Sequence, residues 1–219
     1  MRIAIVEDHV LMGDSLSTVL RLMGHEVLVP ALSSMEETAA DLEAFGPQVV
    51  LLDLDLGRTG WGTALIRPAT DLGARVVIMT GLVDESEIGK ALSLGAAGWV
   101  SKSVPFHEFI DLVLVAASGG AILDELERDR LTRVWWKRRE SQRELLRALE
   151  SLSPKEEEVL AELMAGRSVG RIAAAGFVSA ATVRTHVRGI LVKLGVNSQL
   201  EAVALATGAG WAAHSHAGA

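Results

Sequence analysis

The chain has 219 residues, of which 49% are hydrophobic, and this allows one large or two modest domains with buried cores. It contains no cysteine, which excludes disulfides, thiolate metal sites and cysteine nucleophiles. No signal peptide or membrane-spanning stretch is predicted, so we expect a cytoplasmic protein without membrane contacts. The net charge of −7 arises from residues 1–118, which carry 16 acidic and 7 basic side chains, and it therefore does not exclude a nucleic-acid partner for the rest of the chain.

Four short apolar runs in the first half of the chain each end in polar side chains suited to binding a phosphoryl group. The runs end at Glu7 and Asp8, at Asp53, at Thr80 and at Lys102. Because the runs alternate with helical stretches, they predict the buried parallel strands of an α/β domain with crossover helices. Ligands bind at the carboxyl ends of the strands in such sheets, so these side chains should meet in one small site.

The chemistry of this site follows from its side chains. Three crowded carboxylates repel one another unless a cation lies among them, and a small number of hard oxygen ligands favours Mg2+. Asp53 would then attack phosphorus to form an acyl phosphate, whose charge the Lys102 ammonium and the Thr80 hydroxyl would meet. A strand-end Asp is also common as a helix cap or turn former, which is the alternative for Asp53 taken alone.

In residues 1–118 the chain resembles the receiver domain of two-component response regulators. The motifs that carry the resemblance are Val6-Glu7-Asp8-His9, Leu51-Leu52-Asp53-Leu54-Asp55, Thr80-Gly81 and Gly98-Trp99-Val100-Ser101-Lys102. The resemblance implies a doubly wound, flavodoxin-like α/β domain with a five-stranded parallel sheet. It also implies that a sensor histidine kinase phosphorylates Asp53.

The same resemblance assigns roles to the other site residues. Mg2+ would be held by Glu7, Asp8, Asp53 and the backbone carbonyl of Asp55. Thr80 and Lys102 would bind phosphoryl oxygens, and Thr80 would couple to Trp99, an aromatic residue on the last strand, as a switch. Phosphorylation would thereby change a surface over residues 84–118, and we expect this surface or the following linker to form a homodimer.

Residues 119–150 alternate charges densely and form the predicted helical linker between two domains. A 4,3,4,3 spacing connects the positions Leu131, Trp135, Arg138, Gln142, Leu145, Leu149 and Leu152. This heptad pattern with two polar interruptions is compatible with a short coiled coil between two protomers. It is equally compatible with a single helix that packs its apolar residues on a neighbouring domain, and both interpretations stay open.

Residues 151–207 predict a separate all-helical domain. Ser153-Pro154-Lys155-Glu156 is a capping box that begins one helix, a second helix runs from about Ser168 to Ala175, and Ser179 caps a longer third helix. One face of the third helix is an apolar stripe formed by Val183, Val187, Ile190, Leu191 and Leu194. The opposite face carries Thr182, Arg184, Thr185, Arg188 and Lys193. This is the layout of a helix-turn-helix, whose second helix enters the major groove of DNA.

Residues 150–207 resemble the LuxR-type output domain of NarL/FixJ-like regulators. The motifs that carry this resemblance lie in residues 152–160, 166–173, 179–187 and 193–196. The resemblance implies that the five polar residues of the third helix contact DNA, and that the protein binds promoter DNA as a homodimer and acts on RNA polymerase. Packing or capping is the alternative to base contact for His186.

The last residues of the chain are rich in Gly and Ala. We expect residues 208–219 to form a flexible tail because of this composition. His214 and His216 are metal-binding side chains by type, but disorder is the simpler expectation for them.

The predicted function is that of a transcription regulator and not of an enzyme: phosphorylation of Asp53 with Mg2+ changes dimerisation and sequence-specific DNA binding. One alternative is a regulator that binds DNA without phosphorylation and carries a vestigial receiver. The other is an aspartate-nucleophile phosphatase of the haloacid dehalogenase type. The phosphatase is disfavoured because its acidic pair follows its lysine, whereas Glu7 and Asp8 precede Lys102 in this chain.

Overall fold

The computed structural model describes residues 1–81 and 84–213, so the expectation for His214 and His216 lies outside the described residues. Contacts divide the chain into two compact units, residues 1–137 and 138–219, and each unit is described by itself. Helix α6 (Glu125–Glu150) contributes residues to both units. Within the described part of the chain, no single helix is both long enough and apolar enough to cross a membrane. Helices α9 (Ala180–Leu194) and α10 (Gln199–Gly208) meet that criterion only as a pair, across a 57° bend.

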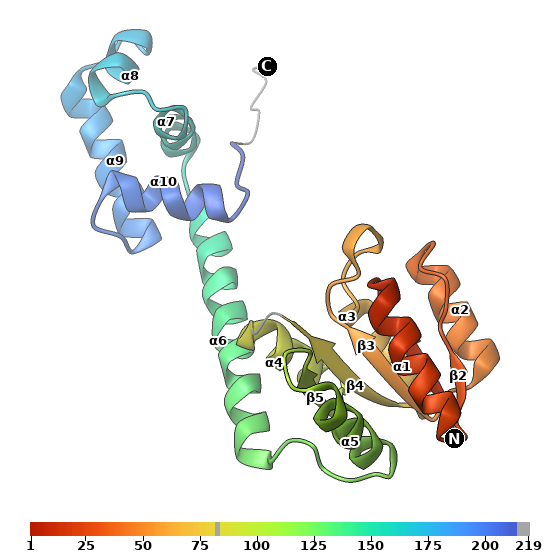
Figure 1. The fold of residues 1–219 in the computed structure, drawn as a ribbon. Coiled ribbons are helices and arrows are strands. Elements are labelled where there is room, and N and C mark those ends of the chain that lie inside the picture. The colour runs from red at the N-terminus through yellow and green to blue at the C-terminus, as the bar shows by residue number, and fades with distance from the viewer. Residues whose placement is uncertain (82–83, 214–219) are drawn as a thin grey trace. The chain divides into compact units, whose positions relative to one another are not determined.

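The first unit is built on one parallel β-sheet (Figure 1). Its strands are β1 (Arg2–Val6), β2 (Glu26–Leu28), β3 (Val49–Asp53), β4 (Arg75–Thr80) and β5 (Gly98–Ser101). They lie in the order β2-β1-β3-β4-β5, and all four pairings are parallel. The predicted five-stranded, doubly wound sheet is therefore confirmed. The direction of winding reverses between β1 and β3, which is where such sheets bind ligands.

Helices cover both faces of this sheet. They are α1 (Val10–Leu22), α2 (Met35–Phe45), α3 (Thr63–Asp71), α4 (Glu85–Ser93) and α5 (Phe106–Ala117), with a short 3-10 helix, η1 (Gly57–Thr59). Successive strand residues point to opposite faces. Val50 and Leu52 accordingly pack with α2, α3 and α4, whereas Val49 and Leu51 pack with α1 and α5, which lie together on one side of the sheet in Figure 1. Burial on both faces explains why the strands are continuous apolar runs.

The first half of α6 belongs to the core of the first unit. Leu131 is 1% exposed and joins the cluster that contains Ile88 of α4. A glycine at position 89 of α4 permits this packing, because a Cβ built on Gly89 would overlap the carbonyl oxygen of Leu131 and lie 3.1 Å from Trp135 Cβ. The two helix backbones therefore meet more closely than any larger residue at position 89 would allow.

Two arginines of α6 fix its position along α4. The Arg130 guanidinium donates to both carboxylate oxygens of Glu85, at 2.9 and 2.8 Å. Arg128 donates to the backbone carbonyls of Ala96 and Ala97, just after α4 ends. The Arg130 pair is exposed and adds little stability, so the buried contact of Leu131 carries more of the packing energy.

Both units use positions of the predicted heptad pattern, in α6 and just after it, in their own cores. Leu131 is buried in the first unit, and Leu149 and Leu152 are 1% and 6% exposed in the core of the second. These contacts are made within one chain, as in the single-helix interpretation of the linker. A coiled coil between protomers stays a prediction.

The second unit is all-helical, as predicted. After α6 it contains α7 (Pro154–Met164), α8 (Val169–Ala175), α9 (Ala180–Leu194) and α10 (Gln199–Gly208). A serine begins each helix and accepts a hydrogen bond from the backbone three residues further on, and these caps are Ser153, Ser168, Ser179 and Ser198. The predicted capping box of α7 is present, and the stripe on α9 lies against the core of the unit.

Candidate functional site

Side chains from three strand ends meet at the carboxyl edge of the sheet. Asp53 ends β3, its side chain is 6% exposed, and it lines a cavity of about 690 Å3. Lys102 follows β5, and its Nζ lies 2.5 Å from Asp53 Oδ2. Thr80 ends β4, is buried and lines the same cavity, and its backbone carbonyl accepts a hydrogen bond from the Lys102 backbone amide at 2.9 Å. The predicted convergence of these three residues is present in the fold.

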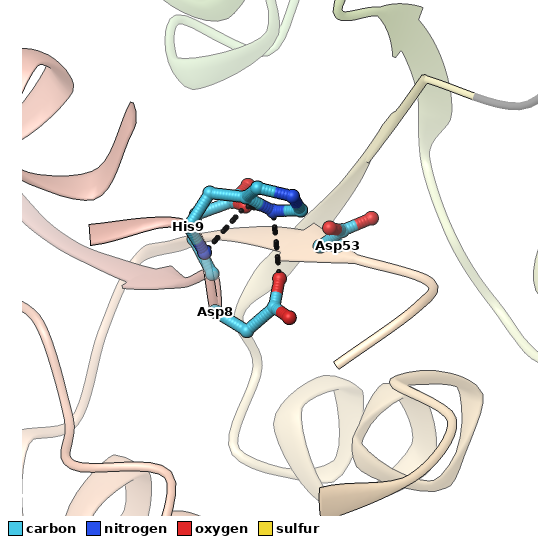
Figure 2. A group of neighbouring side chains, drawn as sticks. Asp8, His9 and Asp53 are labelled. Carbon is cyan, nitrogen blue, oxygen red and sulfur yellow. Dashed lines mark hydrogen bonds and ion pairs between the residues drawn. The ribbon is translucent and has the colours of Figure 1, made fainter. Parts of the chain in front are cut away.

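An acidic pair and a histidine from the segment after β1 complete the cluster. One ligand atom from each of Glu7, Asp8, His9 and Asp53 lies within 4.8 Å of the others, and Figure 2 shows Asp8, His9 and Asp53 as neighbours. His9 Nδ1 is 2.8 Å from both Glu7 Oε1 and Asp8 Oδ1. His9 was not among the site residues predicted from the sequence, although its position directly after the acidic pair was an available signal.

A single ammonium group balances two carboxylates that have little contact with water. Lys102 Nζ is 2.5 Å from Glu7 Oε2 as well as from Asp53 Oδ2, and the Glu7 side chain is fully buried. The approach to Glu7 is not aligned for a hydrogen bond, so among the described residues Glu7 Oε2 accepts none. Buried charges need close partners. The Lys102 ammonium is the close partner of this oxygen, at a distance of 2.5 Å.

The environment shifts the pKa values of these groups. Burial raises the pKa of the Asp53 carboxyl, and the contacts with Lys102 offset this only in part. Burial acts to lower the pKa of the Lys102 ammonium, but its contacts with Asp53 and Glu7 outweigh burial and raise that pKa. The hydrogen bond to Glu7, with the charge of Asp8, raises the pKa of the His9 imidazole. The raised pKa values of Lys102 and His9 reflect the carboxylates beside them, whereas that of Asp53 reflects mainly its burial.

Backbone contacts hold the loop after β3 beside Asp53. Gly62 donates its backbone N–H to the Leu54 carbonyl at 2.9 Å, and Asp55 and Trp61 form an isolated antiparallel bridge. A Cβ on Gly62 would overlap the Asp53 carbonyl oxygen, so a larger residue there would displace the strand end. Sequence reasoning missed this glycine because only the close approach in three dimensions reveals it.

The Asp55 carbonyl has no competing hydrogen bond among residues 1–81 and 84–213, which is compatible with its predicted role as a metal ligand. Its backbone amide donates to Asp53 Oδ1 at 3.3 Å. Trp99 lies on β5 beside Ile78 and is half-buried against the core on the α2–α4 side of the sheet. Its coupling to Thr80 stays a prediction.

In the second unit, α9 presents an exposed polar face. Thr182, Arg184, Thr185 and Arg188 are all exposed on this helix. Thr182 Oγ1 is 2.8 Å from Ser179 Oγ and Thr185 donates to the Ala181 carbonyl, whereas neither arginine forms an ion pair within the described chain. A helix with exposed arginines on one face and a buried stripe on the other suits contact with a phosphate backbone.

Lys193, the fifth predicted DNA contact, has a structural partner. Its Nζ donates to Glu156 Oε2 and to the Ser151 carbonyl, both at 2.7 Å, and Glu156 Oε2 also accepts the Ser153 backbone N–H at 2.7 Å. Burial acts to raise the pKa of Glu156, but these contacts outweigh it and hold the pKa below its ordinary value of 4.5. Lys193 thus ties α9 to the start of α7, and its contact with DNA remains untested.

Replacement of Glu156 by Gln should destabilise this junction in a pH-dependent way. Since the folded pKa of Glu156 is depressed, its contribution is present above the unfolded pKa near 4.5 and is lost as the pH falls through the folded value. At pH 7 we expect the variant to lose about 1 kcal/mol, seen as faster hydrogen exchange of α7 and α9 amides. Glu158→Gln, at an exposed ion pair with Lys155, is the matched control. If Glu156→Gln loses the same free energy of unfolding at pH 7 and at pH 3.5, the role assigned to the Glu156 carboxylate is wrong.

Comparisons with known proteins cover both units. Residues 3–114 match the family described as "Response regulator receiver domain", and residues 150–206 match "Bacterial regulatory proteins, luxR family". A crystal structure of a LuxR-family two-component response regulator from Aurantimonas sp. SI85-9A1 is similar in fold, with a TM-score of 0.50 and 24% identity over 60% of this chain and 95% of that one. It supports the fold assignment alone.

Two curated relatives align over nearly the whole chain. The "Probable transcriptional regulatory protein NarL" of Mycobacterium tuberculosis is 30% identical over 208 residues, which cover 93% of this chain and 92% of the relative. The "Nitrate/nitrite response regulator protein homolog" of Haemophilus influenzae is 28% identical over 206 residues, which cover 94% and 95%. The protein therefore belongs to the two-component response regulators in which a receiver domain is joined to a LuxR-type DNA-binding domain, and it is a transcriptional regulator.

Proposed function

We propose that Asp53 is the residue that a sensor histidine kinase phosphorylates, and that the phosphoryl group changes dimerisation and sequence-specific binding to promoter DNA. The observation that carries this proposal is the pairing of Asp53 Oδ2 with Lys102 Nζ at 2.5 Å, at a buried strand end that opens into a cavity. Membership of the receiver family implies phosphorylation at an aspartate. Asp53 is the carboxylate whose surroundings suit that chemistry best.

The transfer can be written from the residues of the chain. An Asp53 carboxylate oxygen attacks phosphorus, the P–N bond to the kinase imidazole breaks, and the ring nitrogen takes the electron pair. Lys102 is positioned to donate to a phosphoryl oxygen, since its ammonium already lies beside the attacking group. Thr80 lines the same cavity and would donate its hydroxyl to a second phosphoryl oxygen.

The acidic cluster fits Mg2+. Glu7, Asp8, Asp53 and the Asp55 carbonyl supply hard oxygen atoms, and Glu7 Oε2 is buried without a hydrogen bond. When bound, Mg2+ would neutralise charge on the phosphoryl oxygens. Lys102 now holds the carboxylates that the metal would need, so metal binding should shift the ammonium toward the incoming phosphoryl group.

In the second unit, we propose that α9 enters the major groove. Arg184 and Arg188 would bind phosphates, and Thr182 and Thr185 lie at the amino-terminal part of the helix, which approaches the bases first. A homodimer would present two such helices to half-sites about one turn of DNA apart. The dimer would act in the cytoplasm, with RNA polymerase as its further partner.

The position of Asp53 argues against a phosphatase. In aspartate-nucleophile phosphatases of the haloacid dehalogenase type the nucleophile lies on the first strand, whereas Asp53 ends β3 and the acidic pair follows β1. We therefore propose a regulator that carries one phosphoryl group as a signal. A regulator with a vestigial receiver is the second candidate, and the next experiment separates the two.

The function is tested by DNA binding with and without phosphorylation. Duplex DNA is first selected from a random pool by the full-length protein, and affinity is then measured with acetyl phosphate and Mg2+ present or absent. We expect phosphorylation to change the affinity of the wild type about tenfold or more, which corresponds to coupling of about 1.4 kcal/mol. Asp53→Asn should not respond. If the wild type takes up phosphate but binds DNA with the same affinity before and after phosphorylation, the vestigial receiver is favoured.

A further inference from the structure

The turn between α8 and α9 contains an unusual backbone conformation. Phe177 has φ of +51°, and it is the one residue other than glycine with positive φ in the described chain. Helix α8 ends there with two hydrogen bonds, from Gly176 N to the Ile172 carbonyl at 3.0 Å and from Val178 N to the Ala173 carbonyl at 3.1 Å. This helix ending puts one residue in the left-handed region, where glycine is favoured and a bulky side chain is strained.

The Phe177 side chain gains nothing from its own unit. It is 97% exposed, the highest value among the large exposed hydrophobic residues of the described chain, and Val178 beside it is 47% exposed. An apolar ring left in water forgoes the stabilisation that burial would give. Backbone conformation and core packing would both favour a smaller residue at position 177, so neither accounts for a phenylalanine. Residues held in strained conformations often serve binding.

The location of this ring indicates what it would touch. The turn directly precedes the amino-terminal end of α9, the part of a recognition helix that reaches the DNA bases. Residues 163–200 contain no Asp or Glu, and the two glutamates of α7 that lie near the turn, Glu158 and Glu162, are paired with Lys155 and Arg167, so their charge is balanced toward a phosphate backbone. Apolar surface in the major groove is offered by the thymine methyl group and by the deoxyribose edge.

We propose that Phe177 is a DNA-contacting residue that packs its ring on apolar groups of the duplex, either a thymine methyl or a deoxyribose. The contact adds affinity without neutralising a phosphate. This inference rests on the proposed DNA-binding function and adds to it a contact of a different chemical kind from those of Arg184 and Arg188.

The test compares full-length wild type with Phe177→Gly on a duplex selected by the wild type. Glycine adopts the backbone conformation without strain, so hydrogen exchange of α8 and α9 amides should be as slow as in the wild type or slower. DNA affinity should nevertheless fall about tenfold. The slope of log affinity against log salt should not change, because no charge is removed. Phe177→Asn, whose side chain also tolerates this conformation, serves as a second variant, and Leu22→Ala trims a similarly exposed apolar residue of α1 as the control.

A second arm identifies the apolar group on the DNA. Uracil is substituted for each thymine of the selected site, which removes the methyl group alone. If a thymine methyl is the partner, uracil at one position of the DNA weakens binding by the wild type and leaves the DNA affinity of Phe177→Gly unchanged. If deoxyribose is the partner, no uracil substitution changes the difference in DNA affinity between the wild type and Phe177→Gly.

Three results would overturn the inference or its basis, and they can be told apart. If Phe177→Gly and Phe177→Asn bind DNA as tightly as the wild type does, the ring does not touch DNA, and a protein partner is indicated instead. Affinity lost together with faster exchange of α9 amides in both variants would show a structural role. Failure of the wild type to bind any selected duplex would contradict the proposed function itself.

Discussion

Lys102→Met should slow phosphorylation of the protein by acetyl phosphate about 10²- to 10³-fold, the usual effect of removing one preorganised donor from a developing negative charge. The methionine side chain is similar in length and keeps the apolar stem of the lysine, so the loss isolates the ammonium. In the present structure that ammonium lies 2.5 Å from carboxylate oxygens of both Asp53 and Glu7. The rate is measured as phosphoryl incorporation per protein over time at saturating Mg2+.

The same substitution should have the opposite effect on metal binding. Lys102 competes with any cation for the two carboxylates, and its removal leaves a more negative cluster, so the variant should bind Mg2+ more tightly than the wild type. Lys155→Met, at an exposed pair with Glu158 in the second unit, is the control and should change neither quantity. Unchanged phosphorylation in Lys102→Met, or weaker Mg2+ binding, would contradict the roles assigned to the ammonium.

Gly89→Ala should separate α6 from α4. The added Cβ would overlap the backbone carbonyl of Leu131, and a backbone cannot rotate away as a flexible side chain can, so one helix must shift. We expect the first unit to lose about 1–3 kcal/mol, the usual range for overpacking a core. Hydrogen exchange should become faster in residues 125–137, where Leu131 is now 1% exposed.

Gly13→Ala provides a matched control for this experiment. Gly13 also lies in a helix, but its added Cβ would meet only Val29 Cγ1 at an ordinary distance of 3.7 Å. Alanine is the better helix former by about 1 kcal/mol, so Gly13→Ala should be neutral or stabilising. If amide hydrogen exchange in residues 125–137 is equally fast in Gly89→Ala and Gly13→Ala, the close α4–α6 contact is not essential to the first unit.

The sequence predicted the features that depend on local pattern. The apolar runs that end at Asp53 and Thr80 are β3 and β4, because strands buried on both faces must be continuously apolar. The helix starts at Ser153 and Ser179 were equally predictable, since a cap involves residues only three positions apart. Parallel pairing then brings the strand ends together without further information.

Features that depend on distant parts of the chain were not predictable in the same way. The face of α9 suggested Lys193 as a DNA contact, but its pairing with Glu156 joins residues 37 positions apart and follows only from the packing of α9 on α7. Leu131 fitted a heptad pattern, yet the pattern does not say whether a partner chain or α4 covers it. The need for glycine at position 62 likewise depends on the approach of the Asp53 carbonyl.

Intact-mass measurement with peptide mapping identifies the phosphorylated residue. Wild type and Asp53→Asn are incubated with acetyl phosphate in the presence and in the absence of Mg2+. We predict that the wild type gains a single phosphoryl group, only with Mg2+, on the peptide that contains Asp53, and that the variant gains none. A phosphoryl group on Asp53→Asn, or on a wild-type peptide without Asp53, would contradict the account.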